Sequence, residues 1–136
     1  KRIPEKEKYK HSKLTKNVAL ECVEKLNKSF AVNKSYLNPE LTLSDLAKEI
    51  DVNPKILSQV INEYYKQNFF DVINRLRIED AKKMLIDDFA GKNVLEILYE
   101  TGFNSKATFN RVFKKETGYS PTEYKKKFTT VSVLTE

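Results

Sequence analysis

Cysteine, histidine, glycine and proline are all scarce in this sequence, and tryptophan is absent. A single Cys excludes an internal disulfide framework and a zinc site built from a Cys cluster. With one His as well, we expect no metal, no cofactor and no acid–base catalysis. Three Gly and four Pro in 136 residues argue against a turn-rich β fold and against a glycine-rich phosphate loop. No window approaches the roughly 20 uninterrupted apolar residues that span a bilayer. These absences favour a soluble helical protein that is not an enzyme.

Positive charge is in excess but is unevenly distributed. Lys and Arg number 25 against 19 Asp and Glu, a formal net charge of +6. Residues 1–16 carry +5, residues 17–102 carry −3, and residues 103–136 carry +4. Such basic ends indicate a polyanionic partner.

Residues 1–16 have few apolar side chains and no apolar core like that of a signal peptide, so they indicate a basic linker. A solvated tail and an arm that touches phosphate or an anionic membrane surface are both compatible with this composition. The first residue is Lys1 rather than Met, which leads us to expect a segment of a longer protein.

From Asn17 the apolar residues follow helical spacing, and they predict a helix over residues 17–31. Cys22 lies within this apolar stripe, so we interpret it as a small buried hydrophobe. Two alternatives are open for this helix: it dimerises, or it packs on the helices that follow.

A helix-turn-helix pattern comes next. Thr42 followed by Asp45 is typical of a helix N-cap, and Pro54 suits the first turn of a second helix. The first helix has a stripe of Leu and Ile. The second has apolar residues at positions 56, 57, 60, 61 and 64, ending with Tyr64. Two short amphipathic helices joined by a tight turn form this motif.

The same pattern returns about fifty residues later, after a predicted long helix over 69–86. Asn93 matches Thr42, Glu96 matches Asp45, and Gly102-Phe103 matches Asp51-Val52. One extra residue follows in the second turn, after which Phe109 matches Leu57. The matched residues are as follows: Ala47 with Leu98, Val60 with Val112, and Ile61 with Phe113. A last short helix begins near Ser120-Pro121.

Fixed spacings along residues 41–128 resemble the signature of AraC/XylS-type transcription regulators. They comprise Arg77-Ile78-x-x-Ala81-x-x-x-Leu85, Val94, Ile97, Gly102-Phe103, Phe109, Phe113 and Gly118-Tyr119-Ser120-Pro121. The run Tyr36–Leu43 also resembles the approach segment of a subgroup common in Bacteroidota. The resemblance implies an all-α fold, with two helix-turn-helix subdomains joined by a long linker helix and an extra N-terminal helix.

The expected organisation is as follows: 1–16 basic linker; 17–40 N-terminal helix and approach segment; 41–68 first helix-turn-helix; 69–90 linker helix; 91–128 second helix-turn-helix; 129–136 C-terminal tail. Two positions depart from the family pattern. Asp51 and Lys66 stand where glycine is usual, and Lys66 is the less suitable of the two for a left-handed cap.

The resemblance assigns base reading to seven positions on the second helix of each motif: Lys55, Ser58 and Gln59, and then Lys106, Ala107, Asn110 and Arg111. Arg suits guanine, Gln and Asn suit adenine, and the methyl of Ala suits thymine. Asn62 is a further exposed candidate, and Thr108 and Lys114 are better interpreted as phosphate contacts. For Lys114, Lys115 and Lys125–Lys127, a solvated face and a phosphate contact are equally compatible with the sequence. Five aromatic residues of the second motif and the last helix lie at core positions: Phe103, Phe109, Phe113, Tyr119 and Tyr124.

The expected function is sequence-specific binding of double-stranded promoter DNA, with two recognition helices reading successive major-groove segments. The alternative is a helical protein-interaction domain that does not read DNA. The resemblance implies RNA polymerase as a partner and a sensory or membrane-embedded region in the full-length protein. We expect a cytoplasmic location, either of a free protein or of the cytoplasmic part of a membrane-anchored regulator. No small-molecule site is evident in the sequence.

Overall fold

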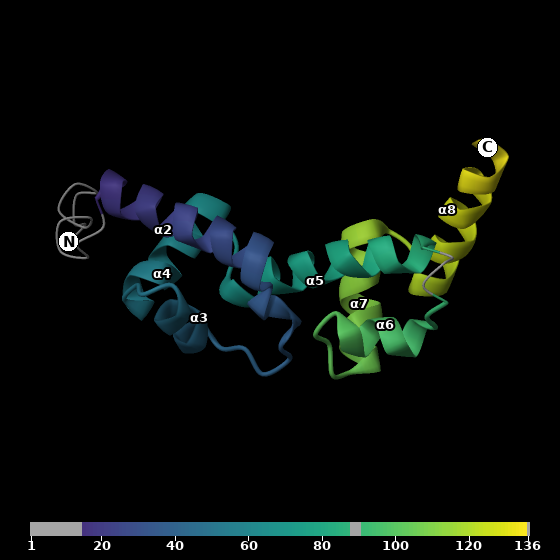
Figure 1. Ribbon diagram of the computed structural model, residues 1–136, viewed down its shortest axis with the longest axis horizontal. Helices are drawn as coiled ribbons and strands as arrows, with labels where there is room; N and C mark the ends of the chain where they lie inside the picture. The colour runs from purple at the N-terminus through teal and green to yellow at the C-terminus, as the bar shows by residue number, and fades with distance from the viewer. Residues whose placement is uncertain (1–14, 88–90, 136) are drawn as a thin grey trace, which may run out of the picture. The chain divides into compact units, whose positions relative to one another are not determined.

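The computed structural model describes residues 15–87 and 91–135, with backbone alone from residue 130 onward. All the regular elements in these ranges are helical (Figure 1). In chain order they are α2 (Lys16–Lys28), η1 (Ser29–Asn33), η2 (Ser35–Leu37), α3 (Leu43–Glu49), α4 (Pro54–Val60), η3 (Ile61–Tyr65), α5 (Phe69–Ile86), α6 (Val94–Glu100), α7 (Lys106–Thr117) and α8 (Pro121–Thr135). The all-α fold predicted from the sequence is therefore confirmed. The basic segment up to residue 14 lies outside the described residues, and within them no helix is both long and apolar enough to cross a membrane.

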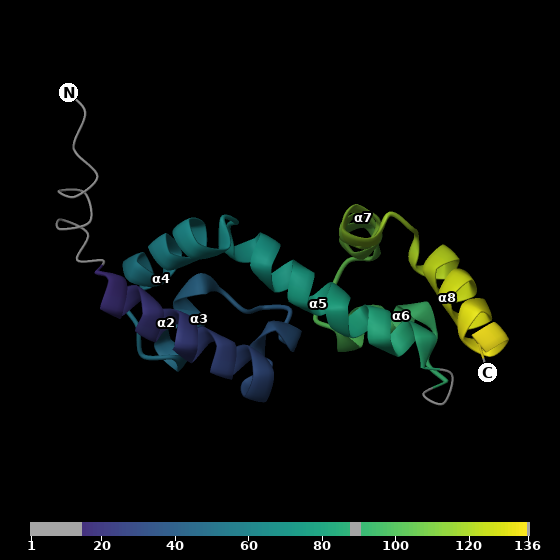
Figure 2. The same cartoon turned by 90° about the horizontal axis from the view of Figure 1, so that it is seen from above.

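The chain divides into two compact units. Unit 1 holds residues 1–35 and 40–72, and unit 2 holds residues 36–39 and 73–136. The long helix α5 begins in unit 1 and continues into unit 2 as one unbroken helix (Figure 2). Each unit has its own buried core, so the cores are described separately.

In unit 1, α2 packs against α4, and α3 packs against α4. The face of α2 that is buried consists of Ala19, Cys22 and Leu26. Burial raises the pKa of the Cys22 thiol, as expected for a hydrophobic core residue rather than a nucleophile. Of the two alternatives left open for this helix, packing on the first helix-turn-helix is the one that the structure shows.

Glu49 at the end of α3 links this helix to the segment after α2 by hydrogen bonds. Its carboxylate accepts hydrogen bonds from the side chains of Ser29, Ser35 and Asn33, which lie in or beside η1 and η2. Burial on its own would raise the pKa of Glu49, but the three hydrogen bonds outweigh it and hold the pKa below its ordinary value. The charged form of Glu49 therefore stabilises the junction between α3 and the segment after α2.

The core of unit 2 is rich in aromatic residues. Phe109 and Phe113 of α7 are fully buried, and edge-on ring contacts join Phe103 to Phe109 and Phe113 to Tyr124. Tyr124 and Phe128 bring α8 into this core. The prediction that these aromatic rings form the core is confirmed. Helix α8 also continues to Thr135, well past residue 128, where the sequence pattern ends.

The predicted internal repeat is present in the backbone. After α3 the N–H of Val52 donates to the carbonyl of Ala47 at 2.9 Å, and after α6 the N–H of Phe103 donates to that of Leu98 at 3.1 Å. The residue before each of these donors is left-handed, with φ of +56° at Asp51 and +98° at Gly102. The same reversal of chain direction thus occurs with Asp51 at the left-handed position in one unit and Gly102 in the other. These are the two positions that the sequence repeat pairs.

The repeat extends further than the sequence pattern indicated. Lys66 (φ +55°) ends η3 and Gly118 (φ +82°) ends α7, both in the left-handed region. Two residues later, Asn68 caps α5 through the N–H of Asp71, and Ser120 caps α8 through the N–H of Glu123. The start of α5 is therefore the counterpart of α8, and each unit contains a three-helix motif.

A short strap, residues 36–39, belongs to unit 2 although it precedes the first helix-turn-helix in the chain. The buried Arg77 donates from Nε to the carbonyl of Tyr36 at 2.6 Å and from its terminal nitrogen to that of Asn38 at 3.0 Å. The Tyr36 hydroxyl donates to Asp80 at 2.6 Å. Burial, together with this hydrogen bond to the carboxylate, raises the pKa of Tyr36. The strap is therefore held by α5 at three points.

Gly102 fits this arrangement for two reasons. Its φ of +98° is unfavourable for any side chain, and a Cβ there would lie 2.6 Å from the carbonyl oxygen of Tyr36 and 2.8 Å from Nε of Arg77. Gly118 shares the first property, with φ of +82°, but a Cβ there would meet nothing within 4 Å. Substitution at Gly118 therefore tests the left-handed backbone alone, whereas substitution at Gly102 tests the backbone and the steric contact together.

We expect Gly118→Ala to lower the free energy of unfolding by about 1 kcal/mol, the cost of left-handed backbone for alanine. Gly102→Ala should cost clearly more, about 3 kcal/mol, because it also displaces the strap and Arg77. Urea unfolding of both variants measures the difference. Equal losses would contradict the close packing of the strap.

The Glu49 network predicts a pH dependence. A carboxyl with a lowered pKa in the folded state contributes stability above its unfolded pKa, about 4.3, and loses it as the pH falls through the folded value. Glu49→Gln should therefore be less stable at pH 7, by no more than about 1 kcal/mol because Glu49 is exposed. It should also lose less stability than the wild type on acidification. Unfolding midpoints at pH 7 and pH 3.5 test this, with the exposed Glu24→Gln as a control for the charge change.

Candidate nucleic-acid interface

Local capping fixes where each helix of the two helix-turn-helix motifs begins. Thr42 accepts a hydrogen bond from the N–H of Asp45 at 3.1 Å and donates its own N–H to the Asp45 carboxylate. Asn93 caps α6 through the N–H of Glu96 at 2.8 Å. Both caps were predicted from the sequence, and both are confirmed.

The second helix of each motif begins with a cap as well. The Asn53 side chain accepts from the N–H of Lys55 at 2.8 Å, with Pro54 in the first turn of α4. The Ser105 hydroxyl accepts from the N–H of Thr108 at 3.3 Å at the start of α7. These caps determine which turns of α4 and α7 carry the predicted site residues.

Core packing decides which face of α4 and α7 is left outside. Leu57, Val60 and Ile61 are buried in unit 1, and Phe109, Val112 and Phe113 take the equivalent places in unit 2. Because these residues occupy one side of each helix, the opposite side is available to a partner.

Most of the predicted site residues lie on that outer side. The exposed positions are Lys55, Asn62, Lys106, Ala107, Asn110, Arg111 and Lys114. Ser58, Gln59 and Thr108 are half-buried at the flanks of their helices. The sequence interpretation of all three as exposed is corrected here, because neighbouring helices flank α4 and α7. Gln59 also donates to Glu63 at 3.4 Å, one turn further on.

Tyr64 is a second correction. The sequence pattern placed it in the buried stripe of the second helix, but its side chain is 48% exposed. The reason is a change of helical pitch, because α4 continues as the wider η3 from Ile61 to Tyr65. The extra residue per turn rotates Tyr64 out of the core.

The predicted site residues form equivalent pairs in the repeat. With an offset of 52 residues the pairs are Lys55 with Ala107, Ser58 with Asn110, Gln59 with Arg111, and Asn62 with Lys114. The two helices therefore present the same surface positions with different chemistry.

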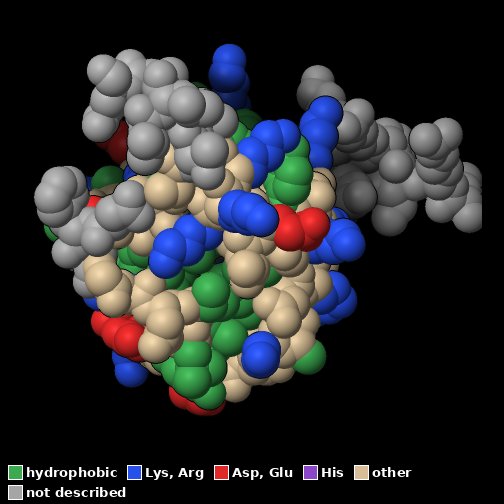
Figure 3. Space-filling view, turned by 90° about the vertical axis from the view of Figure 1, so that its right-hand side faces the viewer, with side chains coloured by type: hydrophobic (Ala, Val, Ile, Leu, Met, Phe, Trp, Pro, Cys, Tyr) green, Lys and Arg blue, Asp and Glu red, His purple; other side chains and the backbone are tan. Residues whose placement is uncertain are grey.

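Charge differs strongly between the two surfaces. The segment from Asn53 to Tyr65 has one Lys and one Glu and is neutral, whereas the segment from Ser105 to Glu116 carries +3. Lys114 and Lys115 lie in the last turn of α7, where cations also favour the helix dipole. A space-filling view shows Lys and Arg side chains around apolar patches (Figure 3).

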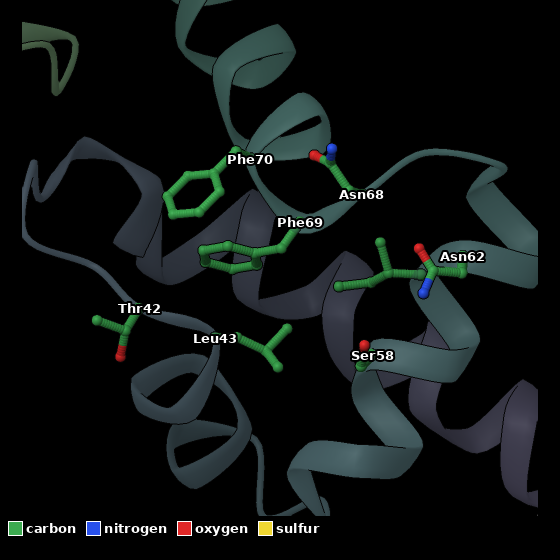
Figure 4. A pocket seen from close by; sticks show the side chains of 8 residues that line it. Thr42, Leu43, Ser58, Asn62, Asn68, Phe69 and Phe70 are labelled. Atoms are coloured by element: carbon green, nitrogen blue, oxygen red, sulfur yellow. The ribbon is translucent and has the colours of Figure 1, made fainter.

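Each unit also has a cleft beside its second helix, and sequence reasoning missed both. The first cleft, about 340 Å³, lies between the start of α3, the flank of α4 and the start of α5 (Figure 4). The second cleft, about 410 Å³, lies between the starts of α6 and α8 and the flank of α7. Matched linings are Leu43 with Val94, Ser58 with Asn110, Asn62 with Lys114, Asn68 with Ser120, Phe69 with Pro121, and Phe70 with Thr122. The shared Asn/Ser-x-x-Asp/Glu spacing at 68–71 and 120–123 was the sequence signal for this equivalence.

Exposed large apolar side chains do not occur on α4 or α7 in the described ranges. They lie on α2, η1, η3, α5 and α6. A protein-interaction domain that used the second helix of each motif would need apolar residues there. The outer faces of α4 and α7 are instead polar or basic, as in proteins that bind a polyanion.

Comparison with known proteins agrees with this geometry. A family model for the helix-turn-helix domain matches residues 46–127, which is more than half of the chain. The chain belongs to the AraC-type helix-turn-helix family. Domains of this family bind DNA in transcription regulators, so the expected class of function is confirmed.

Several known regulatory proteins are similar to the chain. An uncharacterized HTH-type transcriptional regulator in the cgkA 5′ region of Pseudoalteromonas carrageenovora is 31% identical over 102 residues, which cover 75% of this chain and 58% of that protein. The uncharacterized transcriptional regulatory protein YesN of Bacillus subtilis is 34% identical over 92 residues, which cover 66% and 25%. The chain thus spans less than two thirds of the length of these relatives.

A solved structure supports the fold. The C-terminal domain of the two-component response regulator yesN from Fusobacterium nucleatum is 27% identical, with a TM-score of 0.60, and the match covers 70% of this chain and 90% of that one. Three residues other than glycine have positive φ in the described part of the chain: Lys34, Asp51 and Lys66. The last two stand at the reversal positions where the family pattern has glycine.

Proposed function

We propose that this AraC-type domain binds a specific sequence in double-stranded promoter DNA, with α4 and α7 as recognition helices in successive major-groove segments. The observation that supports this proposal is the pairing of polar surface positions on two equivalent helices whose inner faces are fixed by separate cores. Recognition helices of this class lie in the major groove, and neighbouring groove segments on one face are about 34 Å apart.

Base reading falls first to one matched pair of residues, one on each recognition helix. Arg111 can donate two hydrogen bonds to guanine O6 and N7, and its counterpart Gln59 can pair with adenine. Asn110 lines the second cleft with Lys106, and Ser58 lines the first cleft. Ala107 offers a methyl group, and Lys55 offers a cation at the equivalent point of unit 1.

The remaining candidates are better suited to phosphate. Lys106 lies about one turn before Asn110 and Lys114 about one turn after it, on the side of α7 that lines the second cleft. Thr108 lies in the first turn of α7, and Asn62 takes the place of Lys114 in unit 1. Contacts of this kind set the register of a protein on DNA without reading its sequence.

In the full-length protein, we propose that this domain works in the cytoplasm with RNA polymerase and under the control of a sensory or membrane-embedded region. The support for such a region is that the related regulators extend well beyond the part that matches this chain.

Selection of bound duplexes from a random DNA pool tests the proposed function. We expect the wild-type chain to enrich two short motifs whose centres lie about one helical turn, 10–11 base pairs, apart. Arg111→Ala should lose about 1–3 kcal/mol of binding free energy, confined to one base pair of one motif. A uniform loss across all sequences would make Arg111 a phosphate contact instead, and failure to enrich any motif would contradict sequence-specific binding.

The charge difference predicts that α7 supplies most of the salt-dependent affinity. Replacing Lys106, Lys114 and Lys115 by Gln should make the slope of log K against log salt shallower by about 2 to 3, since each phosphate contact contributes about 0.9. A control with the same change in net charge replaces the exposed Lys28, Lys48 and Lys83. If both triple variants alter the slope equally, net charge rather than α7 controls binding.

A further inference from the structure

Phe70 is an exposed aromatic residue at the edge of the first cleft. Its side chain is 63% exposed, whereas that of its neighbour Phe69 is 8% exposed. The two rings meet edge to face, with centroids 5.2 Å apart and planes at 70°. The Phe69 ring therefore holds the Phe70 ring in place. The apolar surface of Phe70 stays exposed to water, which is unfavourable in free energy.

The first cleft places this ring beside the proposed recognition surface. Phe69 and Phe70 come from the start of α5, and Thr42 and Leu43 from the start of α3. Ser58 comes from the flank of α4 and Asn62 from η3 (Figure 4). Two of these residues, Ser58 and Asn62, are themselves candidate DNA contacts. The ring is thus continuous with the surface that the proposed function assigns to DNA.

The second cleft shows what chemistry its position favours. There Lys114 stands in the place of Asn62, Thr122 stands in the place of Phe70, and Lys106 adds a second cation. Two lysines lining one cleft suit a phosphate group. Because the repeat makes the two clefts equivalent, both are expected to face the same part of the DNA.

Helix-turn-helix geometry indicates which part this is. The recognition helix enters the major groove, and the first helix of the motif crosses the backbone. A cleft lined both by the flank of the recognition helix and by the start of the first helix therefore lies along the sugar–phosphate backbone at the edge of the groove. This backbone alternates charged phosphates with deoxyribose rings, whose carbon atoms can pack against an aromatic side chain.

We propose that Phe70 is a DNA contact that packs against a deoxyribose of the backbone beside the groove segment read by α4. This inference rests on the proposed function, and it adds a residue and a type of contact that the family match does not assign. The first recognition unit would then gain affinity by burying apolar surface, whereas the second gains it by neutralising phosphate. Binding by the first unit would depend little on salt.

The experiment measures the affinity of the whole chain for a duplex selected by the wild type, at several salt concentrations. Phe70→Ala should weaken binding about fivefold at every salt concentration. The variant lacks the apolar surface, roughly half of an aromatic side chain, that the wild type buries when it binds DNA. The slope of log K against log salt should stay unchanged. Phe70→Leu should recover most of the affinity, because it keeps an apolar side chain of similar length.

Two further variants control the interpretation. Tyr64→Ala removes another exposed aromatic residue of unit 1, which lies two positions after Asn62 on roughly the opposite side of η3 and does not line the cleft. It should leave the affinity unchanged. Asn62→Lys gives the first cleft the lysine of the second, and it should steepen the salt slope by about 0.9 if the cleft faces a phosphate. This last variant tests the position of the cleft even if Phe70→Ala is poorly folded.

The outcomes separate the two proposals. Failure of the wild type to select any duplex would overturn the proposed function and this inference with it. If the wild type selects a duplex but Phe70→Ala binds it as tightly, Phe70 is not a DNA contact, and the exposed ring serves another partner such as a protein. A shallower salt slope for Phe70→Ala would also contradict an apolar contact, and an unchanged slope for Asn62→Lys would place the cleft away from the backbone.

Discussion

The buried guanidinium of Arg77 organises the second unit, and much of what surrounds it depends on that charge being satisfied. A charged group that is 7% exposed must find partners inside the protein. It finds them in two carbonyls of residues 36–39 and in the side chain of Asn74, and it lies 5.7 Å from the ring centroid of Phe103. Burial lowers the pKa of Arg77, although an arginine stays charged at any ordinary pH. The strap, the reversal at Gly102 and the entry into α7 are therefore mutually dependent.

Local rules in the sequence predicted most of the fold. Caps at Thr42 and Asn93, the proline that begins α4, and the apolar stripes of each helix are properties of short segments, and they can be seen without coordinates. The repeat could also be aligned residue by residue, because the reversals at Asp51 and Gly102 require the same unusual backbone conformation. Lys66 was identified as an unsuitable cap, and the structure shows that it does adopt the left-handed conformation.

Other features could not be predicted because they depend on contacts between distant segments or on subtle changes of pitch. Tyr64 leaves the core because of the wider helix that ends at Tyr65. The docking of residues 36–39 depends on Arg77, some forty positions away in the chain. The clefts are formed by three helix segments each, so no single stretch of sequence indicates that Phe70 and Asn62 are neighbours. The candidate site residues themselves follow from helix periodicity and family resemblance, whereas the half-burial of Ser58 and Gln59 depends on packing around α4.

The strap has a consequence for how the domain can be divided. Unit 2 is discontinuous in sequence, because residues 36–39 belong to it while the residues on both sides belong to unit 1. A fragment that starts after residue 72 would lack the carbonyls that Arg77 needs, and one that stops there would leave residues 36–39 without their docking site. The second helix-turn-helix is consequently not an independent module that recombination or limited proteolysis could release intact. Evolution would have to transfer the two helix-turn-helix motifs together, as one piece.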